Sequence, residues 1–366
     1  MEQPLLGLMT TDLPRPTATR LPPTWELLSA VGREAEIPIL FFHPHQMALG
    51  ANSVSGFRQR ANGSWWYGRT KLPHLIVDQV FVHIARLDPQ YAALKRSLRA
   101  RGIPVLNPRL PDKRGVWRAL SDSPALAAHL PATDSLLRAE EAIGWLTRYP
   151  SVFLKPVRGS KGQGVLCISR AEDGLFTIAE QKRRTVDRAQ LLQLIAAQLK
   201  RTPHLIQQGV SLVEVGGCKI DLRVVLFRDG ERRWRPVTTV PRAGQAGQAV
   251  TNLARGGRIE PLSWLEAEMN KRRLNMPTRE QIEQVAILTA EALTPIRPTL
   301  AFLGIDIGLT TDGELYPLDI NPRPGRQALS MADRKAAYQH LLAFCTTIAP
   351  PRRKAVPPLR SDRQKF

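Results

Sequence analysis

Two carboxylates and an amide stand close together in GIDIGLTTDGELYPLDINPRPG, residues 304–325. Asp306 lies in one predicted strand, and Asp319 and Asn321 share a face of the next, because strand side chains alternate. The Asp-Gly turn at 312–313 folds the first strand back beside the second. Adjacent carboxylates need a cation or strong donors, and Mg²⁺ prefers such hard oxygens. We therefore predict a magnesium site here; the alternative is that Asp319 or Asn321 only caps a turn near Pro322.

A second stretch is suited to binding an anion. In FLKPVRGSKGQGV, residues 153–165, an apolar strand leads through Lys155 into a loop with three glycines and two further cations. No Gly-Lys-Ser/Thr ends the loop, so it is not a Walker A motif. Gly159, Gly162 and Gly164 also lack the spacing of a dinucleotide fingerprint. The loop alone therefore predicts that an anion binds here, but it does not show which kind of anion.

Polar residues between these two stretches form a third group. Asp221 and Arg223 share a strand face in DLRVV, and Arg242, Asn252 and Arg255 follow, the last beside a Gly-Gly pair. Guanidinium groups bind phosphate or carboxylate oxygens bidentately. A surface ion pair is the simpler interpretation of any single arginine, but the group together favours a binding site for an anion.

The composition is that of a basic globular protein. Its 366 residues include 52 Lys+Arg and 32 Asp+Glu, a net charge of +20, which favours anionic partners or reflects an arginine-rich proteome. No apolar run is long enough for a membrane span, and no signal peptide is recognisable at the N-terminus. The three cysteines form no CxxC pair, which indicates a reducing cytosol. No helix-turn-helix, RNP or zinc pattern predicts specific nucleic-acid binding.

Hydrophobic periodicity predicts an α/β (α+β) chain in several parts. Strands are expected at 37–44 and 75–84 with a hairpin or exposed lip between them, and helices at 89–102, 134–150, 186–200, 278–293 and 332–348. The Asp-Gly pair at 229–230 predicts a long hairpin. We expect an N-terminal α/β domain over 1–110, subdomains over 111–210 and 211–349, and a basic disordered tail over 350–366.

The order of these motifs resembles that of the ATP-grasp superfamily. FLKPVRGSKGQGV, DLRVVLF, RAGQAGQAVTNLARGG, GIDIG and LDINPRPG occur in the order seen in its YheC/YheD branch, which is associated with endospore coats. This branch is related to RimK-like ribosomal-protein glutamate ligases and to glutathione synthetases. The resemblance covers roughly residues 100–345. It implies an ATP-grasp fold that follows a pre-ATP-grasp domain and holds a nucleotide between two β-rich subdomains.

The resemblance also implies roles for particular residues. Lys113 and Lys155 would contact nucleotide phosphates from a strand or domain edge, and Gln207 to Val210 would form the hinge whose backbone reads adenine. Many relatives have Glu where this chain has Gln208 and where it has Asp319. The ribose contact is left open between Glu214 and Asp221. The phosphate lid and its neighbours would be Gly159, Ser160, Lys161, Gly162, Gly164 and Asn252. Asp306, Asp319 and Asn321 would hold one or two Mg²⁺, with Mn²⁺ as the alternative ion.

The activity implied is that of an ATP-dependent carboxylate–amine ligase. A carboxylate attacks the γ-phosphate of ATP, and an amine then displaces phosphate from the acylphosphate. Arg242, Arg255 and Arg223 are the candidates for binding the carboxylate or the transferring phosphoryl group. The alternative is a coat- or surface-associated protein that binds ATP with little turnover. The basic composition favours an acidic amino acid or peptide as substrate and a cytoplasmic location, or the spore coat in a spore former; the oligomeric state is left open.

Overall fold

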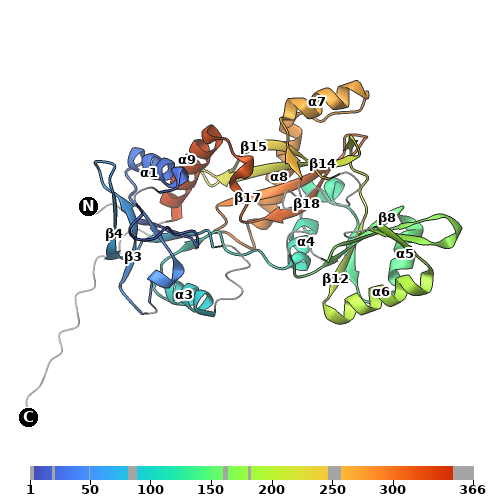
Figure 1. Cartoon of the computed structure of the whole chain (residues 1–366), viewed down its shortest axis with the longest axis horizontal. Coiled ribbons are helices and arrows are strands. Elements are labelled where there is room, and N and C mark those ends of the chain that lie inside the picture. The colour runs from blue at the N-terminus through green and yellow to red at the C-terminus, as the bar shows by residue number, and fades with distance from the viewer. Residues whose placement is uncertain are drawn as a thin grey trace, which may run out of the picture. The chain divides into compact units, whose positions relative to one another are not determined.

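The computed structural model describes residues 4–18, 21–48, 50–80, 89–159, 164–179, 183–245 and 257–348. The chain divides into two compact units (Figure 1): Met1–Leu106 with Leu342–Phe366, and Asn107–Leu341. The helix α9, Met331–Ile348, contributes residues to both. Within the described ranges, no helix is both long and apolar enough to cross a membrane. The tail predicted over 350–366 lies outside the described residues.

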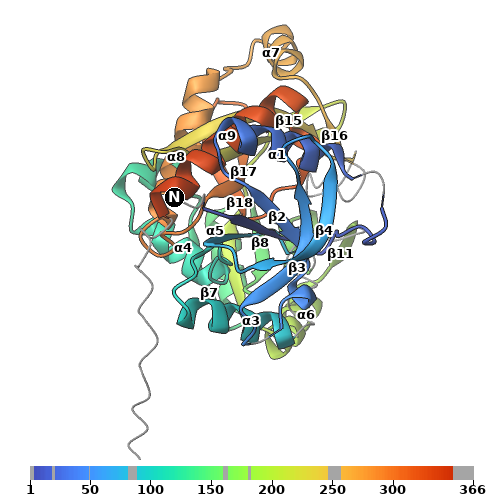
Figure 2. The same cartoon turned by 90° about the vertical axis from the view of Figure 1, so that its left-hand side faces the viewer.

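The first unit contains a mixed sheet in the order β4-β3-β2-β1-β5-β6, which faces the viewer in Figure 2. β1, β2, β5 and β6 run parallel, and the β3–β4 hairpin adds an antiparallel edge. Trp25 of α1 stacks on Phe41, while α3 packs with Leu40 and Phe42 on the other face, since neighbouring strand residues alternate. The elements are β1 Leu6–Met9, α1 Pro23–Glu34, β2 Ile39–Phe42, η1 Pro44–Gln46, β3 Ser53–Gln59, β4 Trp65–Lys71, β5 Leu75–Asp78, α3 Pro89–Ala100 and β6 Val105–Leu106.

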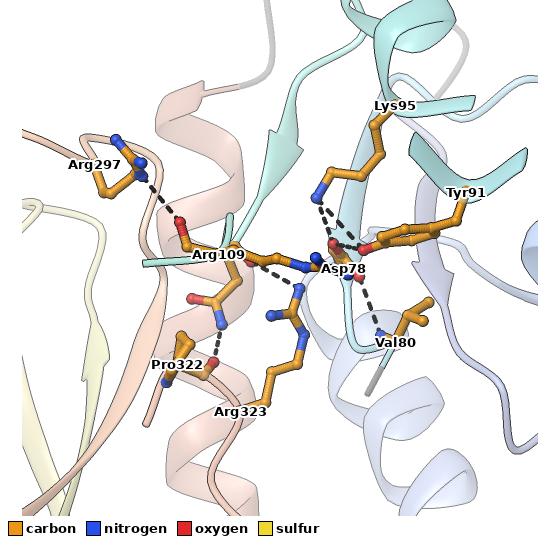
Figure 3. Close-up of polar contacts among 9 residues, drawn as sticks. Asp78, Val80, Tyr91, Lys95, Arg109, Arg297, Pro322 and Arg323 are labelled. Atoms are coloured by element: carbon orange, nitrogen blue, oxygen red, sulfur yellow. Dashed lines mark hydrogen bonds and ion pairs between the residues drawn. The ribbon is translucent and has the colours of Figure 1, made fainter. Parts of the chain in front are cut away.

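Most predicted elements of this unit are confirmed, with shorter strands. The stretches 37–44 and 75–84 contain the four-residue strands β2 and β5, and residues 81–88 lie outside the described ranges. β5 ends at the buried Asp78, whose carboxylate accepts hydrogen bonds from Tyr91, from Lys95 Nζ at 2.8 Å and from the Val80 amide at 3.1 Å (Figure 3). This buried charge is therefore neutralised within its own unit.

The second unit contains an antiparallel sheet in the order β11-β10-β9-β8-β12-β7. α5 and α6 cover one face, where Leu154, Ile168 and Ile206 meet Leu146, Leu191 and Ile195 of the helices. The opposite face carries the alternate side chains of β8, including Phe153 and Lys155. The elements are β7 Thr133–Leu136, α5 Glu141–Arg148, β8 Ser151–Pro156, β9 Leu166–Arg170, η3 Glu172–Gly174, β10 Phe176–Ala179, β11 Arg183–Val186, α6 Arg188–Arg201 and β12 His204–Gln208.

The predicted helix over 134–150 is wrong in its first half. Residues 133–136 form the edge strand β7, which pairs antiparallel with β12 so that Leu136 lies opposite His204. The helix α5 begins only at Glu141, whose carboxylate accepts a hydrogen bond from the Leu137 amide at 3.1 Å. Leu136 thus reaches the predicted core from a strand, because pairing with β12 outweighs the local helical spacing.

A second sheet follows in the order β16-β15-β14-β17-β18, with β13 paired to β14. Its core side chains, such as Leu222, Val224 and Ile305, meet the buried side of α8, whose predicted capping box at Thr278 and Gln281 is confirmed. The elements are α4 Lys113–Ser121, η2 Pro124–His129, β13 Glu214–Val215, β14 Cys218–Arg228, β15 Trp234–Ala243, β16 Arg258–Ile259, α7 Leu262–Lys271, α8 Arg279–Leu293, β17 Phe302–Leu309, β18 Leu315–Asn321 and η5 Arg326–Ala328.

The helix α4 belongs to the core of this second sheet although it precedes the first sheet in the sequence. Its residue Leu120 is 2% exposed within that core. Asp112 caps the helix by accepting a hydrogen bond from the Gly115 amide at 3.0 Å. Lys113 is therefore the first residue of a helix rather than part of a strand, and its amide donates to the Val157 carbonyl just after β8 at 3.1 Å.

Candidate functional site

The strands β17 and β18 bring the predicted acidic residues together. Asp306 lies directly opposite Asp319 in the antiparallel ladder, and Gly304 lies opposite Asn321. The register shifts between Asp306 and Ile307, because Ile307 pairs with Pro317 and leaves Leu318 as an extra residue. The carboxylates therefore meet beside a β-bulge, a feature often found next to functional sites.

Asp306 is held by two guanidinium groups. Arg223 Nε donates to Oδ1, and Arg242 Nη2 lies 2.7 Å from Oδ2. Arg242 also binds Asp221 through two contacts, Nε to Oδ1 at 2.7 Å and Nη2 to Oδ2 at 2.5 Å. Burial alone would lower the pKa of Arg242, but Asp306 and Asp221 raise it above the ordinary arginine value. The four side chains form a buried network with balanced charge.

Asp319, unlike Asp306, is not bound by an arginine among the described residues. No hydrogen bond or ion pair reaches its carboxylate from any residue that the structure describes, and the residue is exposed to solvent. Desolvation by nearby protein atoms nevertheless raises its pKa, with a further rise from Asp306. Lys113, Lys155 and Arg223 oppose the rise. Asp319 is thus a negative charge with cations nearby but none in contact.

The two lysines predicted to bind the nucleotide, Lys113 and Lys155, lie on different elements near the Asp319 carboxylate, Lys113 on α4 and Lys155 on β8. Lys155 Nζ donates to Gln207 Oε1 and lies 3.5 Å from the carbonyl of the bulged Leu318. Desolvation lowers the pKa of Lys155 to about 8, with Asp319 raising it and Lys113 lowering it further. The pKa of Lys113 is also lowered by burial, against the effect of Asp319. Positive charge is therefore concentrated in a partly dehydrated space next to the acidic pair.

The hinge prediction falls on residues with specific side-chain contacts. Gln207 is buried and its Nε2 donates to Thr133 Oγ1 at 2.8 Å. Gln208 Oε1 accepts from the Ala132 amide at 3.1 Å, which ties the end of β12 to the start of β7. Val210 follows in a half-buried loop. Of the two candidates for the ribose contact, Glu214 is exposed, whereas Asp221 is 2% exposed and paired with Arg242.

The predicted phosphate lid and part of the arginine group are only partly described. Gly159 and Gly164 are present, and Gly164 has φ of +69°, a left-handed conformation that favours glycine. Ser160, Lys161 and Gly162 lie outside the described residues, and so do Asn252 and Arg255. Their predicted roles stay predictions.

The oxygens present fit a hard divalent cation in their chemistry. Asp319 offers a carboxylate that no described residue contacts directly, Asp306 lies opposite it, and Asn321 adds an amide oxygen. Asn321 Oδ1 also accepts from the Arg323 amide at 2.8 Å, which is the turn cap predicted as the alternative. Among the described residues, no group of three or more His, Cys, Asp and Glu forms a metal cluster. A cation here would therefore rely on two carboxylates, the amide and non-protein oxygens.

Asn107 fixes the ends of both acidic strands. Its Oδ1 accepts from the Ala301 and Phe302 amides at 3.1 and 3.2 Å at the start of β17, and its Nδ2 donates to the Pro322 carbonyl after β18. Arg323 Nη2 donates to the Asn107 carbonyl at 3.3 Å, and Figure 3 shows Pro322 and Arg323 at this junction. Sequence reasoning missed Asn107 and Thr133, since neither stands in a motif with recognisable chemistry.

The fold described above is that of an ATP-grasp protein. A family model described as YheC/D like ATP-grasp matches residues 102–348, and the chain belongs to that family, as predicted. It is 24% identical over 305 residues to the endospore coat-associated protein YheD of Bacillus subtilis (strain 168), which covers 79% of this chain and 65% of YheD. The endospore coat-associated protein YheC of the same organism is 23% identical over 284 residues, 74% of this chain and 75% of YheC. The chain thus spans slightly less than two thirds of YheD.

A solved structure supports the fold independently. The ATP-grasp ligase PsnB, complexed with a phosphomimetic variant of a minimal precursor, Mg and ADP, has a TM-score of 0.53 to this chain. The identity is 12%, and the match covers 94% of this chain and 99% of PsnB. The predicted fold class is therefore confirmed.

Proposed function

We propose that this protein is an ATP-dependent carboxylate–amine ligase that binds Mg-ATP. The proposal depends mainly on Asp319, whose carboxylate has no direct partner among the described residues, lies opposite Asp306 and interacts electrostatically with Lys113 and Lys155. A purely structural site has no need for two partly buried lysines near a carboxylate whose charged form is disfavoured by desolvation and by Asp306. A Mg-nucleotide supplies both a cation and an anion that satisfy them.

The residues divide into three roles in this proposal. Lys113 and Lys155 bind phosphate oxygens, and Asp306, Asp319 and Asn321 hold one or two Mg²⁺, with Mn²⁺ as an alternative. The ion, when bound, neutralises and orients the phosphate oxygens. Asp306 would share its oxygens between the ion and the two arginines, because each oxygen that accepts from an arginine keeps a second lone pair. The nearby guanidinium charges weaken the hold of Asp306 on the ion. Gly159–Gly164 cover the phosphates, and the backbone of Gln207–Val210 reads adenine.

The chemistry follows in two steps. A substrate carboxylate oxygen attacks the γ-phosphorus of ATP, and the bond from this phosphorus to the bridging oxygen breaks, which releases ADP. An amine nitrogen then attacks the acylphosphate carbon, phosphate leaves, and the nitrogen loses a proton to solvent. Arg223, Arg242 and Arg255 stabilise the charge on the transferring group and the leaving phosphate. The protein contributes orientation and neutralisation rather than a covalent nucleophile.

The substrate class that we favour is an acidic amino acid or an acidic peptide. The net charge of +20 attracts anions over long range. PsnB, which shares the fold, was solved with a minimal precursor bound. The second candidate function is nucleotide binding with little turnover in a coat-associated protein, because YheD and YheC carry that description. The first function places the protein in the cytoplasm, and the second places it on the spore coat of a spore-forming source.

ADP release with Mg-ATP, screened against amino acids and acidic peptides, tests the ligase. We expect Lys155→Ala and Asp319→Ala to abolish nucleotide binding or turnover without unfolding the chain. Lys200→Ala on the exposed side of α6 is the matched control and leaves both unchanged. Absence of Mg-ATP binding by calorimetry at millimolar nucleotide contradicts the ligase, whereas binding without turnover on any substrate supports the coat-associated alternative.

A further inference from the structure

Lys155 is the end point of a chain of polar contacts that crosses three strands. Lys155 on β8 donates to Gln207 Oε1 on β12, Gln207 Nε2 donates to Thr133 Oγ1 on β7 at 2.8 Å, and Thr133 Oγ1 lies 2.9 Å from the Pro131 carbonyl. Gln207 and Thr133 are register partners, and Lys155 is the diagonal neighbour of Gln207. All three side chains therefore share the sheet face opposite α5 and α6.

The direction of each hydrogen bond in this chain is fixed by the donors available. The Thr133 hydroxyl has one hydrogen, which it donates to the Pro131 carbonyl because that oxygen can only accept. Its own oxygen can then only accept, so Gln207 must present its Nε2 to Thr133. The amide is planar, and its Oε1 consequently points at Lys155, which is a donor only. Thr133 thus determines that Gln207 offers an acceptor to the lysine.

This arrangement keeps the lysine away from the neighbouring carboxylate. Lys155 interacts electrostatically with Asp319, but no ion pair forms between them in the described structure. Without the contact to Gln207, the ammonium would keep only the long contact to the Leu318 carbonyl at 3.5 Å and would move towards Asp319, because the opposite charges attract. Such an ion pair would neutralise both the phosphate-binding cation and the metal-binding carboxylate. The contact with Gln207, which is only 5% exposed, holds the lysine in place.

We propose that Thr133 and Gln207 are positioning residues that hold the Lys155 ammonium for the nucleotide phosphates and leave Asp319 open to the metal ion. The inference rests on the proposed function, because it explains the missing ion pair between Lys155 and Asp319 by the need of both groups to bind Mg-nucleotide. It extends the hinge prediction, which gave Gln207 only a backbone role. The competing explanation is that the same contacts merely join β7 to β12.

Two variants of matched shape test the proposal on the full chain. Thr133→Val removes the hydroxyl, and Gln207→Met removes the amide while keeping the length of the side chain. Mg-ADP affinity is measured by calorimetry, Mn²⁺ affinity without nucleotide by electron paramagnetic resonance, and stability by thermal melting. We expect both variants to weaken Mg-ADP and Mn²⁺ binding about tenfold, as for the loss of a hydrogen bond to a charged group. Thr133→Ser restores binding to within about twofold, because it restores the hydroxyl.

Thr177→Val is the control for the substitution itself. Thr177 lies on β10 in the same sheet and on the same face, remote from Lys155, and its variant should bind like the wild type. Unchanged Mg-ADP and Mn²⁺ affinities in Thr133→Val and Gln207→Met, with only lower melting temperatures, overturn the inference and leave a structural role. Either variant alone decides the matter if the other does not fold. Failure of the wild type to bind Mg-ADP removes the proposed function as well, so the two failures are distinguishable.

Discussion

Asp306 and Asp319 lie opposite each other in the β17–β18 ladder, yet their carboxylates have opposite electrostatic surroundings. Asp306 is bound by Arg223 and Arg242, whereas Asp319 has no direct partner among the described residues and a raised pKa. One acid is therefore part of the folded framework, and the other is held at a cost to stability. Removing the negative charge should therefore destabilise the fold at Asp306 but not at Asp319.

We predict that Asp306→Asn lowers the free energy of unfolding by about 3 kcal/mol, because it leaves buried guanidinium groups without their counter-charge. Asp319→Asn should leave the melting temperature unchanged or raise it, since it removes the repulsion from Asp306. Both variants should lose Mg-ATP turnover. Denaturant unfolding and ADP release measure the two properties. Equal destabilisation by the two substitutions would contradict this view of the pair.

A second prediction concerns the competition between arginine and metal for Asp306. Arg223→Gln frees Oδ1 of Asp306, so Mn²⁺ should bind about tenfold more tightly without nucleotide, because a nearby cation shifts the cation affinity of a carboxylate by one to three orders of magnitude. Turnover should fall, since the arginine also serves the transferring group. Electron paramagnetic resonance of free Mn²⁺ measures the affinity.

The control for this prediction is Arg235→Gln. Arg235 lies on β15, next to the strand β14 that carries Arg223, and it too pairs with an aspartate, Asp229, at 2.7 Å, but away from the acidic pair. Its variant should bind Mn²⁺ like the wild type. An unchanged or weaker affinity in Arg223→Gln would show that the arginine does not compete with the ion.

The sequence predicts that Asp306 and Asp319 lie side by side, because this depends only on residues close to them in the chain. Alternation along β18 and the short Asp-Gly turn suffice to place Asp306 beside Asp319. The partners of Asp306 depend instead on two longer-range pairings. The β14–β15 hairpin sets Asp221 opposite Arg242, and the pairing of β14 with β17 sets Arg223 opposite Asp306. The predicted shared face of Asp221 and Arg223 is correct, but it cannot reveal which carboxylate each arginine binds.

Long-range pairing also explains the errors. Leu136, Ala139, Ile143 and Leu146 have helical spacing, and nothing local shows that Leu136 joins an edge strand on β12. The same strand carries Thr133, so misreading it hid the contacts that orient Gln207. The bulge at Leu318, whose carbonyl approaches Lys155, arises from the pairing of β17 with β18 and has no sequence signal of its own.

A third prediction concerns acid stability at the β14–β15 turn. Burial would raise the pKa of Asp229, but hydrogen bonds from Arg235 and from the Arg233 and Glu231 amides outweigh it and lower the pKa to about 2. A lowered carboxyl pKa stabilises the fold above the unfolded value of about 4 and loses this effect as pH falls towards 2. Asp229→Asn should therefore cost about 1 kcal/mol at pH 7, allowing for solvent screening at a turn.

The difference between wild type and Asp229→Asn should shrink as the pH falls from about 4 to 2, because the wild-type carboxylate is then protonated. Urea unfolding at several pH values measures it. Asp312→Asn, at the exposed Asp-Gly turn between β17 and β18, is the control and should show a smaller effect at pH 7. A difference that is constant from pH 7 to the acid limit would assign the loss to packing rather than to charge.

The last prediction follows from the pKa of Lys155, which burial lowers to about 8 in the nucleotide-free protein. Bound phosphates stabilise the ammonium form and raise this pKa, so nucleotide binding above pH 8 must take up a proton. Mg-ADP affinity should be nearly constant from pH 7 to 8 and then fall by up to tenfold per pH unit. Stability without nucleotide should change in the opposite direction and increase between pH 8 and about 10, because the folded state binds fewer protons than the unfolded state.

Calorimetry in two buffers of different ionisation enthalpy measures the proton uptake directly. At pH 8.5 the apparent binding enthalpy should differ between the buffers for the wild type. In Lys155→Met the residual binding should be weak, and this difference should disappear, because the group that takes up the proton is absent. An affinity that is the same at pH 7 and pH 9, or a proton uptake that persists in Lys155→Met, would assign the titration to another group, of which Lys113 is the nearest candidate because its pKa is also lowered by burial.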